Sequence, residues 1–239
     1  PLLGNENSPE MLVEIAAAIQ SKNKIQALKI TEIPNQTDLD AILEDTSASV
    51  SLKRRLTGLS ESKGVVVDFE SVVTHELSNT INELSSQSSC EWLVMGWDGR
   101  SHSGIFVTNP IGWLLANIDS NLALFKDKGI RHVGKVLLAL RPGRKDRNFI
   151  EIAQKVCSFY GAALTLLHVV PESTTSSTIF DMEKKSSSKL ESTTLKSEVS
   201  IVKSDDPVGT ISGLSASYDL LILGTPEKDN WINVLFGGG

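Results

Sequence analysis

Two stretches of this chain repeat one another, and this repeat constrains the fold more than any other feature of the sequence. Residues 14–34 align with residues 151–171 without a gap, at an offset of 137 positions. A second match follows in the same order, between residues 93–96 and residues 221–224, at an offset of 128 positions. Because two ordered matches rarely arise by chance, the sequence indicates an internal duplication.

The duplication divides the chain into two homologous domains, residues 1–128 and residues 129–239, joined near residues 126–135. A chain of 239 residues is long enough for one large domain or two small ones. The chain begins with an apolar, strand-like sequence and ends in three glycines. We therefore interpret it as a piece of a longer protein, whose second domain is incomplete at its carboxyl end.

Short apolar runs alternate with amphipathic segments throughout the chain. The runs expected to be strands are residues 2–3, 25–33, 65–67, 92–95, 121–125, 136–140, 162–170, 198–202 and 220–223. The expected helices begin at Pro9, Thr37, Val73, Asp146 and Pro207. Strands that are apolar on both faces and alternate with helices predict an α/β fold, in which parallel sheets are flanked by helices. Ligands of such sheets bind beyond the carboxyl ends of the strands.

The composition excludes several classes of function. The formal net charge is −6, which argues against a general nucleic-acid-binding protein. The two cysteines, Cys90 and Cys157, cannot form a disulfide framework and fit a reducing compartment. No run of about 18 apolar residues is present, so no membrane-spanning helix is expected.

Residues 173–197 interrupt the second domain with an unusual composition. Thirteen of these 25 residues are serine or threonine. We expect a mobile, solvated surface loop that ends in a weak helix near residues 184–195. Phosphorylation of these hydroxyl side chains is the functional alternative.

No group of residues has the spacing of a catalytic or metal site. Residues 99–103 differ from the hydrolase motif G-x-S-x-G at its last position. The four histidines lack zinc-ligand spacing, and His168 lies in a strand that is expected to be buried. Cys157 lies on the apolar stripe of the helix that begins at Asp146, where a buried thiol is expected. We expect no catalytic residue, no metal and no enzyme activity.

Segments of both domains resemble the universal stress protein fold, an α/β nucleotide-binding family. The similar segments are residues 135–140, 162–171 and 219–224, together with residues 92–99 of the first domain. The resemblance covers nearly the whole chain and implies two tandem Rossmann-like lobes, each a parallel sheet flanked by helices. Nucleotide-binding members carry a loop G-x-x-G after the fourth strand, followed nine residues later by glycine and a hydroxyl residue.

The nucleotide-binding loop of the family is altered in the first domain. Gly96 and Gly99 supply the opening pair of glycines. Asn109 and Pro110 stand nine residues later, where glycine and a hydroxyl residue belong. Proline removes a backbone N–H group that could bind a phosphate.

The same elements are altered in the second domain. Gly224 is retained, but Glu227 replaces the second glycine, and its carboxylate repels a phosphate. The family places an aspartate after its first strand to hold the nucleotide, and Arg141 occupies that position here. We therefore expect no cofactor and no tight binding of ATP.

A second resemblance concerns a membrane transporter. Residues 2–4, the helix sequence that starts at Ser8, and residues 91–97 resemble the carboxyl-terminal domain of a prokaryotic cation–chloride cotransporter. This resemblance implies a non-catalytic domain at the cytoplasmic face of the cell membrane, which dimerises and influences ion transport. Two alternatives stay open: a soluble tandem universal stress protein that binds ATP, and the cytoplasmic tail of an amino-acid permease.

Basic residues are concentrated where the two domains meet. Eight of the 23 lysines and arginines lie between residues 126 and 147, and they include Arg144, Lys145 and Arg147. The functional interpretation is contact with the anionic inner leaflet or with the transmembrane part of the transporter. The alternative is a solvated linker. Residues 121–126 form an apolar strand sequence, which we expect to be a sheet edge in a homodimer.

Overall fold

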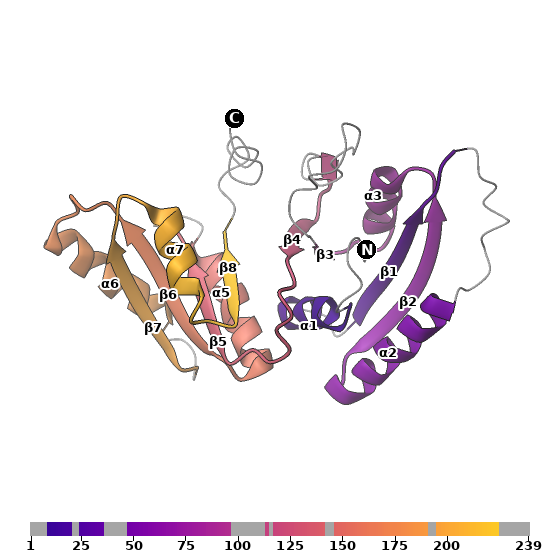
Figure 1. The fold of residues 1–239 in the computed structure, drawn as a ribbon, viewed down its shortest axis with the longest axis horizontal. Coiled ribbons are helices and arrows are strands. Elements are labelled where there is room, and N and C mark those ends of the chain that lie inside the picture. Colours follow the sequence, from indigo (N-terminus) through magenta and orange to yellow (C-terminus); the bar gives the residue numbers. More distant parts are fainter. Residues whose placement is uncertain are drawn as a thin grey trace. The chain divides into compact units, whose positions relative to one another are not determined.

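The computed structural model describes residues 9–20, 24–35, 47–96, 113–114, 117–141, 146–190 and 195–224. The chain separates into two compact units, Pro1–Gly129 and Ile130–Gly239, which are described one at a time (Figure 1). The boundary between the units lies one residue after the predicted domain boundary. No helix in the described ranges is long and apolar enough to cross a membrane.

Unit 1 contains three long helices and four described strands. In chain order they are α1 (Pro9–Ile19), β1 (Lys24–Glu32), α2 (Ser47–Lys63), β2 (Val66–Thr74), α3 (Leu77–Gln87), β3 (Trp92–Gly96) and β4 (Asn121–Phe125). Strand β1 pairs with β2, and β3 pairs with β4; both pairs are parallel. The strand predicted at residues 2–3 and the helix predicted from Thr37 lie outside the described residues.

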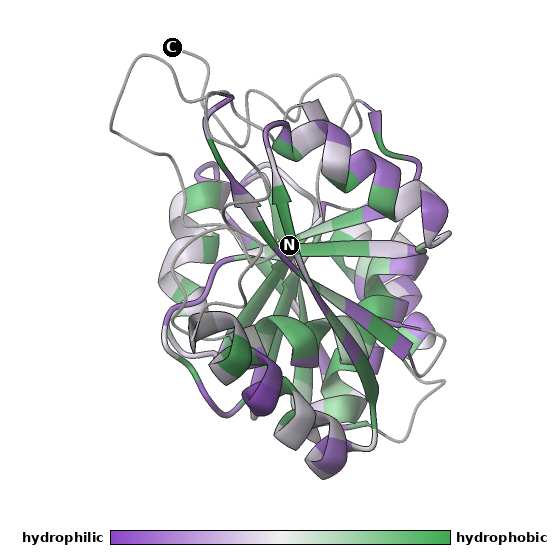
Figure 2. Ribbon diagram, turned by 90° about the vertical axis from the view of Figure 1, so that its right-hand side faces the viewer, coloured by the Kyte–Doolittle hydropathy of each residue, from purple (hydrophilic) through white to green (hydrophobic). Residues whose placement is uncertain are grey.

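Unit 2 contains one four-stranded parallel sheet with the strand order β7-β6-β5-β8. Its elements are β5 (Lys135–Ala139), α5 (Asp146–Tyr160), β6 (Ala163–Val170), α6 (Ser176–Leu190), β7 (Ser197–Lys203), α7 (Pro207–Ser215) and β8 (Leu220–Leu223). The chain runs from β5 outward to β7 and then returns to place β8 on the other side of β5. The predicted α/β fold is confirmed, and Figure 2 shows that its strands are largely hydrophobic.

The two units share an order of elements. Both units contain the same succession of helix, strand, helix, strand, helix and strand, from α1 to β3 and from α5 to β8. Helices α1 and α5 begin at Pro9 and Asp146, which are separated by the first offset. Strands β3 and β8 begin at Trp92 and Leu220, which are separated by the second offset.

Helix α2 was not predicted from the sequence. Its residues are mostly serine and charged side chains, so its apolar stripe is reduced to three leucines at helical spacing. Leu56 is its one fully buried apolar side chain among the described residues, and Leu52 and Leu59 are partly buried beside it. Packing against β2 therefore stabilises this helix more than its own sequence pattern does.

The prediction for the neighbouring strand was wrong in length and burial. Residues 65–67 were expected to be a short buried strand, whereas β2 extends to Thr74 and Val66 is 59% exposed. Val73 belongs to this strand, and helix α3 begins only at Leu77. The physical reason is that β2 pairs with β1 alone among the described strands. An edge strand with one solvated face accepts charged residues that interrupt the apolar run.

The prediction for residues 173–197 was wrong where it expected a mobile loop, since the helix expected near residues 184–195 begins eight residues earlier. Helix α6 occupies Ser176–Leu190, the place that α2 has in unit 1. The Thr175 hydroxyl accepts a hydrogen bond from the backbone N–H of Thr178 and so caps the first turn. Ser186 and Leu190 are buried. Serine-rich composition therefore concealed a helix whose buried contacts are few.

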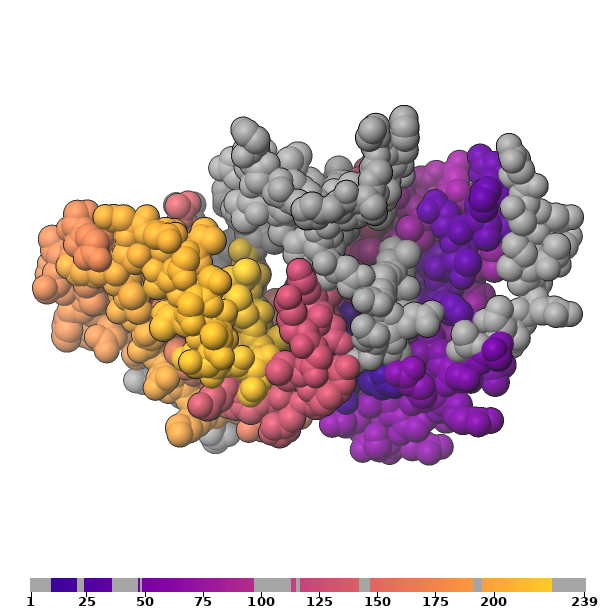
Figure 3. All heavy atoms as spheres, viewed as in Figure 1, coloured from indigo at the N-terminus to yellow at the C-terminus, as the bar shows by residue number. Residues whose placement is uncertain are grey.

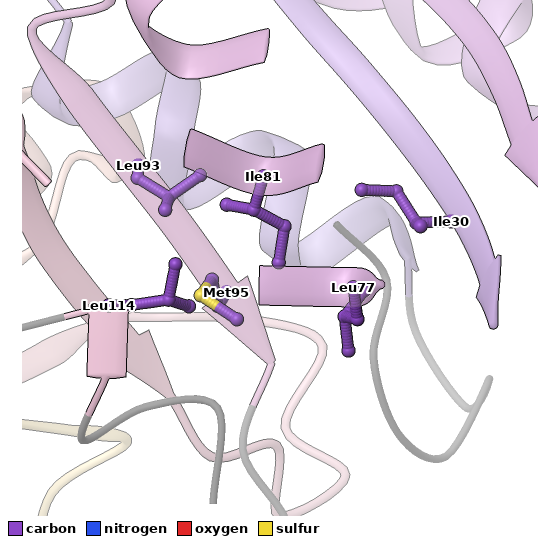
Figure 4. Close-up of a cluster of buried hydrophobic side chains, with 6 residues drawn as sticks. All are labelled: Ile30, Leu77, Ile81, Leu93, Met95 and Leu114. Carbon is purple, nitrogen blue, oxygen red and sulfur yellow. The ribbon is translucent and has the colours of Figure 1, made fainter. Parts of the chain in front are cut away.

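One hydrophobic cluster joins the two strand pairs of unit 1. It combines residues from β1, α3, β3 and the helical residue Leu114: Ile30, Leu77, Ile81, Leu93, Met95 and Leu114. Figure 4 shows the α3 side chains Leu77 and Ile81 between the strand residues of the cluster. Leu122 and Leu124 of β4 pack against the same cluster. Helix α3 therefore acts as the common cover of both strand pairs.

Candidate functional site

The carboxyl ends of β5 and β8 mark the place where a ligand binds in folds of this kind. The chain order reverses between these two strands, and open parallel sheets bind ligands at such a reversal. Ala139 and Leu223 are the last paired residues. Beyond them lie Leu140, the exposed Arg141 and Gly224, and the first turn of α5 follows.

Hydrophobic side chains fill the space around Gly224. A Cβ atom at this position would lie 3.0 Å from Cζ of Phe149 and 3.2 Å from Cδ2 of Leu140. Both distances are shorter than ordinary van der Waals contact, so a larger residue at this position would force the two side chains to shift by a few tenths of an ångström. In the nucleotide-binding family, the glycine lets the backbone approach a phosphate. Here the same close approach is made by the Phe149 ring.

Arg141 gives this edge of the sheet a positive charge. It follows β5 directly, and its side chain is exposed. An exposed guanidinium cannot act as the hydrogen-bond acceptor that the family's aspartate provides, because it carries only N–H donors. Arg147, in the first turn of α5, is also exposed.

Most of the other predicted nucleotide-loop residues lie outside the described residues. Gly96 is described; it is the last residue of β3 and pairs with Phe125 of β4. The remaining predicted positions are Gly99, Asn109, Pro110 and Glu227, and the predicted basic contacts Arg144 and Lys145 lie outside as well.

A buried polar pair lies beneath the candidate site. His168 of β6 is buried, as the sequence predicted, and its Nδ1 lies 3.0 Å from the carbonyl oxygen of Leu140. Its Nε2 lies 3.0 Å from Oγ of Ser186 on α6. Since a carbonyl only accepts, Nδ1 donates its proton to Leu140, and the second hydrogen bond joins Nε2 to the serine hydroxyl. The pair connects α6 to the end of β5.

This pair does not form a nucleophilic site. A serine beside a histidine is the arrangement that activates a hydroxyl for covalent catalysis. Ser186 is buried, however, so no substrate reaches its hydroxyl. Sequence reasoning missed the partner of His168 because Ser186 lies in the weak helix expected near residues 184–195, for which no buried face was predicted. The one sequence feature that indicated a buried, hydrogen-bonded histidine was the position of His168 in a strand expected to be buried.

The opposite end of the same two strands is held by a carboxylate. One oxygen of Asp219, Oδ2, accepts hydrogen bonds from the backbone N–H groups of Gly134 at 2.8 Å and Lys135 at 2.9 Å. These two hydrogen bonds lower the pKa of Asp219, and the nearby His132 and Lys135 add to the effect. Asp219 therefore joins the start of β8 to the start of β5 and takes no part in the candidate site.

We expect Cys157 to be almost inert toward alkylation in the folded chain. The thiol is fully buried, and burial raises its pKa to about 12. This lowers the thiolate concentration at pH 8 about a thousandfold relative to a free cysteine. Cys90 is only half-buried and serves as the internal comparison. Iodoacetamide treatment followed by mass spectrometry should modify Cys90 first, and both thiols in guanidinium. Equal rates in the folded chain would contradict the described burial.

In the described part of the chain, no three side chains of histidine, cysteine, aspartate or glutamate lie close enough to share a metal ion.

Comparison with known proteins identifies the fold. No family model matches the chain, and no curated protein does either. A universal stress protein from Archaeoglobus fulgidus DSM 4304 has a similar structure, with a TM-score of 0.62 and 15% sequence identity, over 92% of this chain and 84% of that chain. A putative universal stress protein from Pseudomonas aeruginosa UCBPP-PA14 has a TM-score of 0.57 and 15% identity, over 87% of this chain and 84% of that chain.

A third structure, of a functionally unknown protein from Pseudomonas aeruginosa PAO1, has a TM-score of 0.56 and 14% identity. It is matched over 88% of this chain and 84% of that chain. The identities are low, so these likenesses establish a universal stress protein-like fold and nothing finer. None of the three structures is described as part of a transporter.

Proposed function

We propose that this chain is a non-catalytic regulatory and dimerisation domain at the cytoplasmic face of a membrane, in a secondary ion transporter of the cation–chloride cotransporter type. The observation that carries the non-catalytic part is the packing at Gly224. Phe149 and Leu140 pack tightly against Gly224, the position of the first glycine of the family's phosphate loop. A stress-protein-like domain without its ligand site is suited to assembly or regulation.

The transporter part of the proposal rests on the sequence resemblance. The residues that carry it fall mainly on α1 and β3, which are adjacent elements of unit 1. Pro9 stands at the first position of α1, and β3 supplies Leu93 and Met95 to the core. These elements belong to the framework of unit 1 and do not lie at the candidate site. The resemblance therefore concerns the kind of domain and carries no ligand with it.

The basic residues between the units support a position beside the membrane. Those that the structure describes are all exposed: Lys126, Lys128, Arg131, Lys135, Arg141 and Arg147. The chain as a whole is acidic, so this concentration of positive charge is local. Each basic residue near an anionic membrane surface contributes about 1 kcal/mol to binding, and salt screens the attraction.

We expect a variant in which Arg144, Lys145 and Arg147 are all replaced by glutamine to bind anionic vesicles about a hundredfold more weakly. The estimate combines three contacts of about 1 kcal/mol each. Co-sedimentation with phosphatidylserine vesicles at low salt measures the binding, and high salt should abolish it. The control removes the same number of charges elsewhere, at Lys53, Arg54 and Lys184, which are exposed on α2 and α6. An equal loss of vesicle affinity in both variants would contradict a membrane contact through Arg144, Lys145 and Arg147.

A soluble tandem universal stress protein that binds ATP is the second candidate function. It is favoured by the comparisons, because two of the matched structures carry that family name and are matched over most of their length. It requires a nucleotide site, and the packing at Gly224 argues against one in unit 2. The tail of an amino-acid permease would share the non-catalytic role. A measurement of ATP binding separates the second candidate from the transporter domains.

A further inference from the structure

Helix α7 and strand β8 leave an apolar face of unit 2 uncovered. No residue of α7 is buried, and Leu214 is 39% exposed near its carboxyl end. Leu223, the last residue of β8, is 57% exposed. Ile211 and Leu221 reach the core from the same face and are only partly buried. In Figure 3, atoms of α7 and β8, coloured gold to yellow, form part of the visible surface of unit 2.

The positions of unit 1 that correspond to this face are covered by other residues. At the offset of the second repeat, Leu223 corresponds to Met95 of β3, which is only 1% exposed. When the N-cap residues Glu76 of α3 and Asp206 of α7 are aligned, Leu214 corresponds to Leu84, which is partly buried in the unit 1 cluster. The same positions of the same fold are therefore covered in unit 1 and exposed in unit 2.

The cover in unit 1 comes from the chain that follows β3. Leu114 is completely buried and belongs to the same cluster as Met95 (Figure 4). It lies in a helical turn, in which the backbone N–H of Ile118 donates to the carbonyl oxygen of Leu114 at 2.9 Å. Ile118 packs against the cluster as well. A short helical segment with two apolar side chains four residues apart thus closes the face.

A segment with the same pattern follows β8 in the sequence. Residues 231–236 read WINVLF, and residues 113–118 of unit 1 read WLLANI. The offset between the two segments is 118, because the connection from the preceding strand is ten residues shorter in unit 2. Each begins with tryptophan, continues with an apolar residue and has a second apolar residue four positions later. We propose that residues 231–236 dock on the apolar face of α7 and β8, with Ile232 in the place of Leu114 and Phe236 in the place of Ile118.

The length of the connection allows this docking. Seven peptide steps separate Gly224 from Trp231, and an extended chain spans up to about 3.5 Å per residue, or about 24 Å in all. This exceeds the distance of about 10 Å between packed layers of secondary structure. Charge does not oppose the docking, because residues 231–236 carry none, and neither does β8. The segment of the same chain is present at every protein concentration, which favours it over a second copy.

The test measures access to the face in the full chain. Leu223→Cys in a Cys90→Ser background leaves one reactive thiol besides the buried Cys157. We expect Ile232→Asp to accelerate labelling of the new thiol by a maleimide at least tenfold, and expect Asn233→Asp, which adds the same charge beside it, to leave the rate unchanged. Ile232→Ser provides a milder variant, and far-UV circular dichroism verifies that each chain is folded.

Three outcomes would overturn the proposal. The first is that the maleimide labels the new thiol at the same rate in the chain that retains Ile232 and in the Ile232→Asp and Ile232→Ser variants. The second is equal acceleration by Ile232→Asp and Asn233→Asp, which would indicate an effect of charge and not of docking. The third is a protection that disappears when the protein is diluted, which would assign the face to a second copy of the chain.

Discussion

Replacing Leu122 and Leu124 with aspartate is expected to convert a dimer of this chain into monomers. Both residues lie in β4, which pairs with β3 and with no other described strand. The backbone N–H of Asn121 points toward β3, where it donates to Glu91 at 3.0 Å. Because N–H groups alternate along a strand, those of Leu122 and Leu124 point to the free edge. They are available to a strand of a second copy.

The composition of the strand edges supports this choice of interface. Charged residues lie on two of the other edge strands, Asp68 and Glu70 in β2 and Glu198 and Lys203 in β7, whereas the short edge strand β8 carries none. Strand β4 has the sequence NLALF and carries no charge. Unprotected edges invite pairing, and charges on an edge prevent it. Two aspartates at a paired edge should weaken the dimer by at least about a hundredfold.

Sedimentation equilibrium measures the effect. Leu122 and Leu124 also pack on the unit 1 cluster, so the double variant needs a companion that leaves this packing intact. Ala123→Lys provides it, because consecutive side chains of a strand point to opposite faces. Both variants should sediment as folded monomers. A native chain with the mass of one copy at all concentrations would refute the dimer, and an unchanged dimer in both variants would place the interface outside β4.

The second large effect is expected in the core of unit 1. Ile81→Ala should lower the free energy of unfolding of this unit by about 3 kcal/mol, which is typical for emptying a fully buried position. Ile81 is 1% exposed and belongs to the cluster that joins β1 to β3. Loss of its side chain weakens both strand pairs together. Since the units are separate compact bodies, the transition of unit 2 should stay in place.

Ile211→Ala is the matched control. Ile211 has the corresponding place on α7, but it is only partly buried, so its replacement should cost about 1 kcal/mol. Urea denaturation, monitored by tryptophan fluorescence and by circular dichroism, measures the stability of the Ile81→Ala and Ile211→Ala variants. Similar losses in the two variants would mean that the unit 1 cluster does not join the strand pairs as described.

Much of the fold could be predicted from the sequence because strands that are apolar on both faces give a strong local signal. Strands β3, β5 and β8 and helix α5 lie within a residue of their predicted bounds. The duplication strengthened these predictions, because corresponding segments of the two domains are expected to form the same kind of element. Asp206 and Pro207 marked the start of α7, and the Asp206 side chain indeed accepts a hydrogen bond from the backbone N–H of Gly209.

The elements that sequence reasoning missed have their stabilising contacts elsewhere in the chain. Helices α2 and α6 are rich in serine and charge and have few buried side chains of their own. Their stability comes from neighbouring strands, which a local pattern does not show. The candidate site was predicted only as a set of altered motif positions. The ring of Phe149 against Gly224 depends on the approach of α5 to β8, and no spacing in the sequence indicates it.

Calorimetric titration of the folded chain with magnesium ATP tests the central claim most directly. A universal stress protein-like fold persists here, while Phe149 and Leu140 pack against Gly224 and Arg141 stands where the family has an aspartate. We expect no measurable binding up to about 1 mM ATP, which corresponds to a binding free energy weaker than about 4 kcal/mol. Saturable binding of one or two ATP molecules with a dissociation constant in the low micromolar range would contradict it.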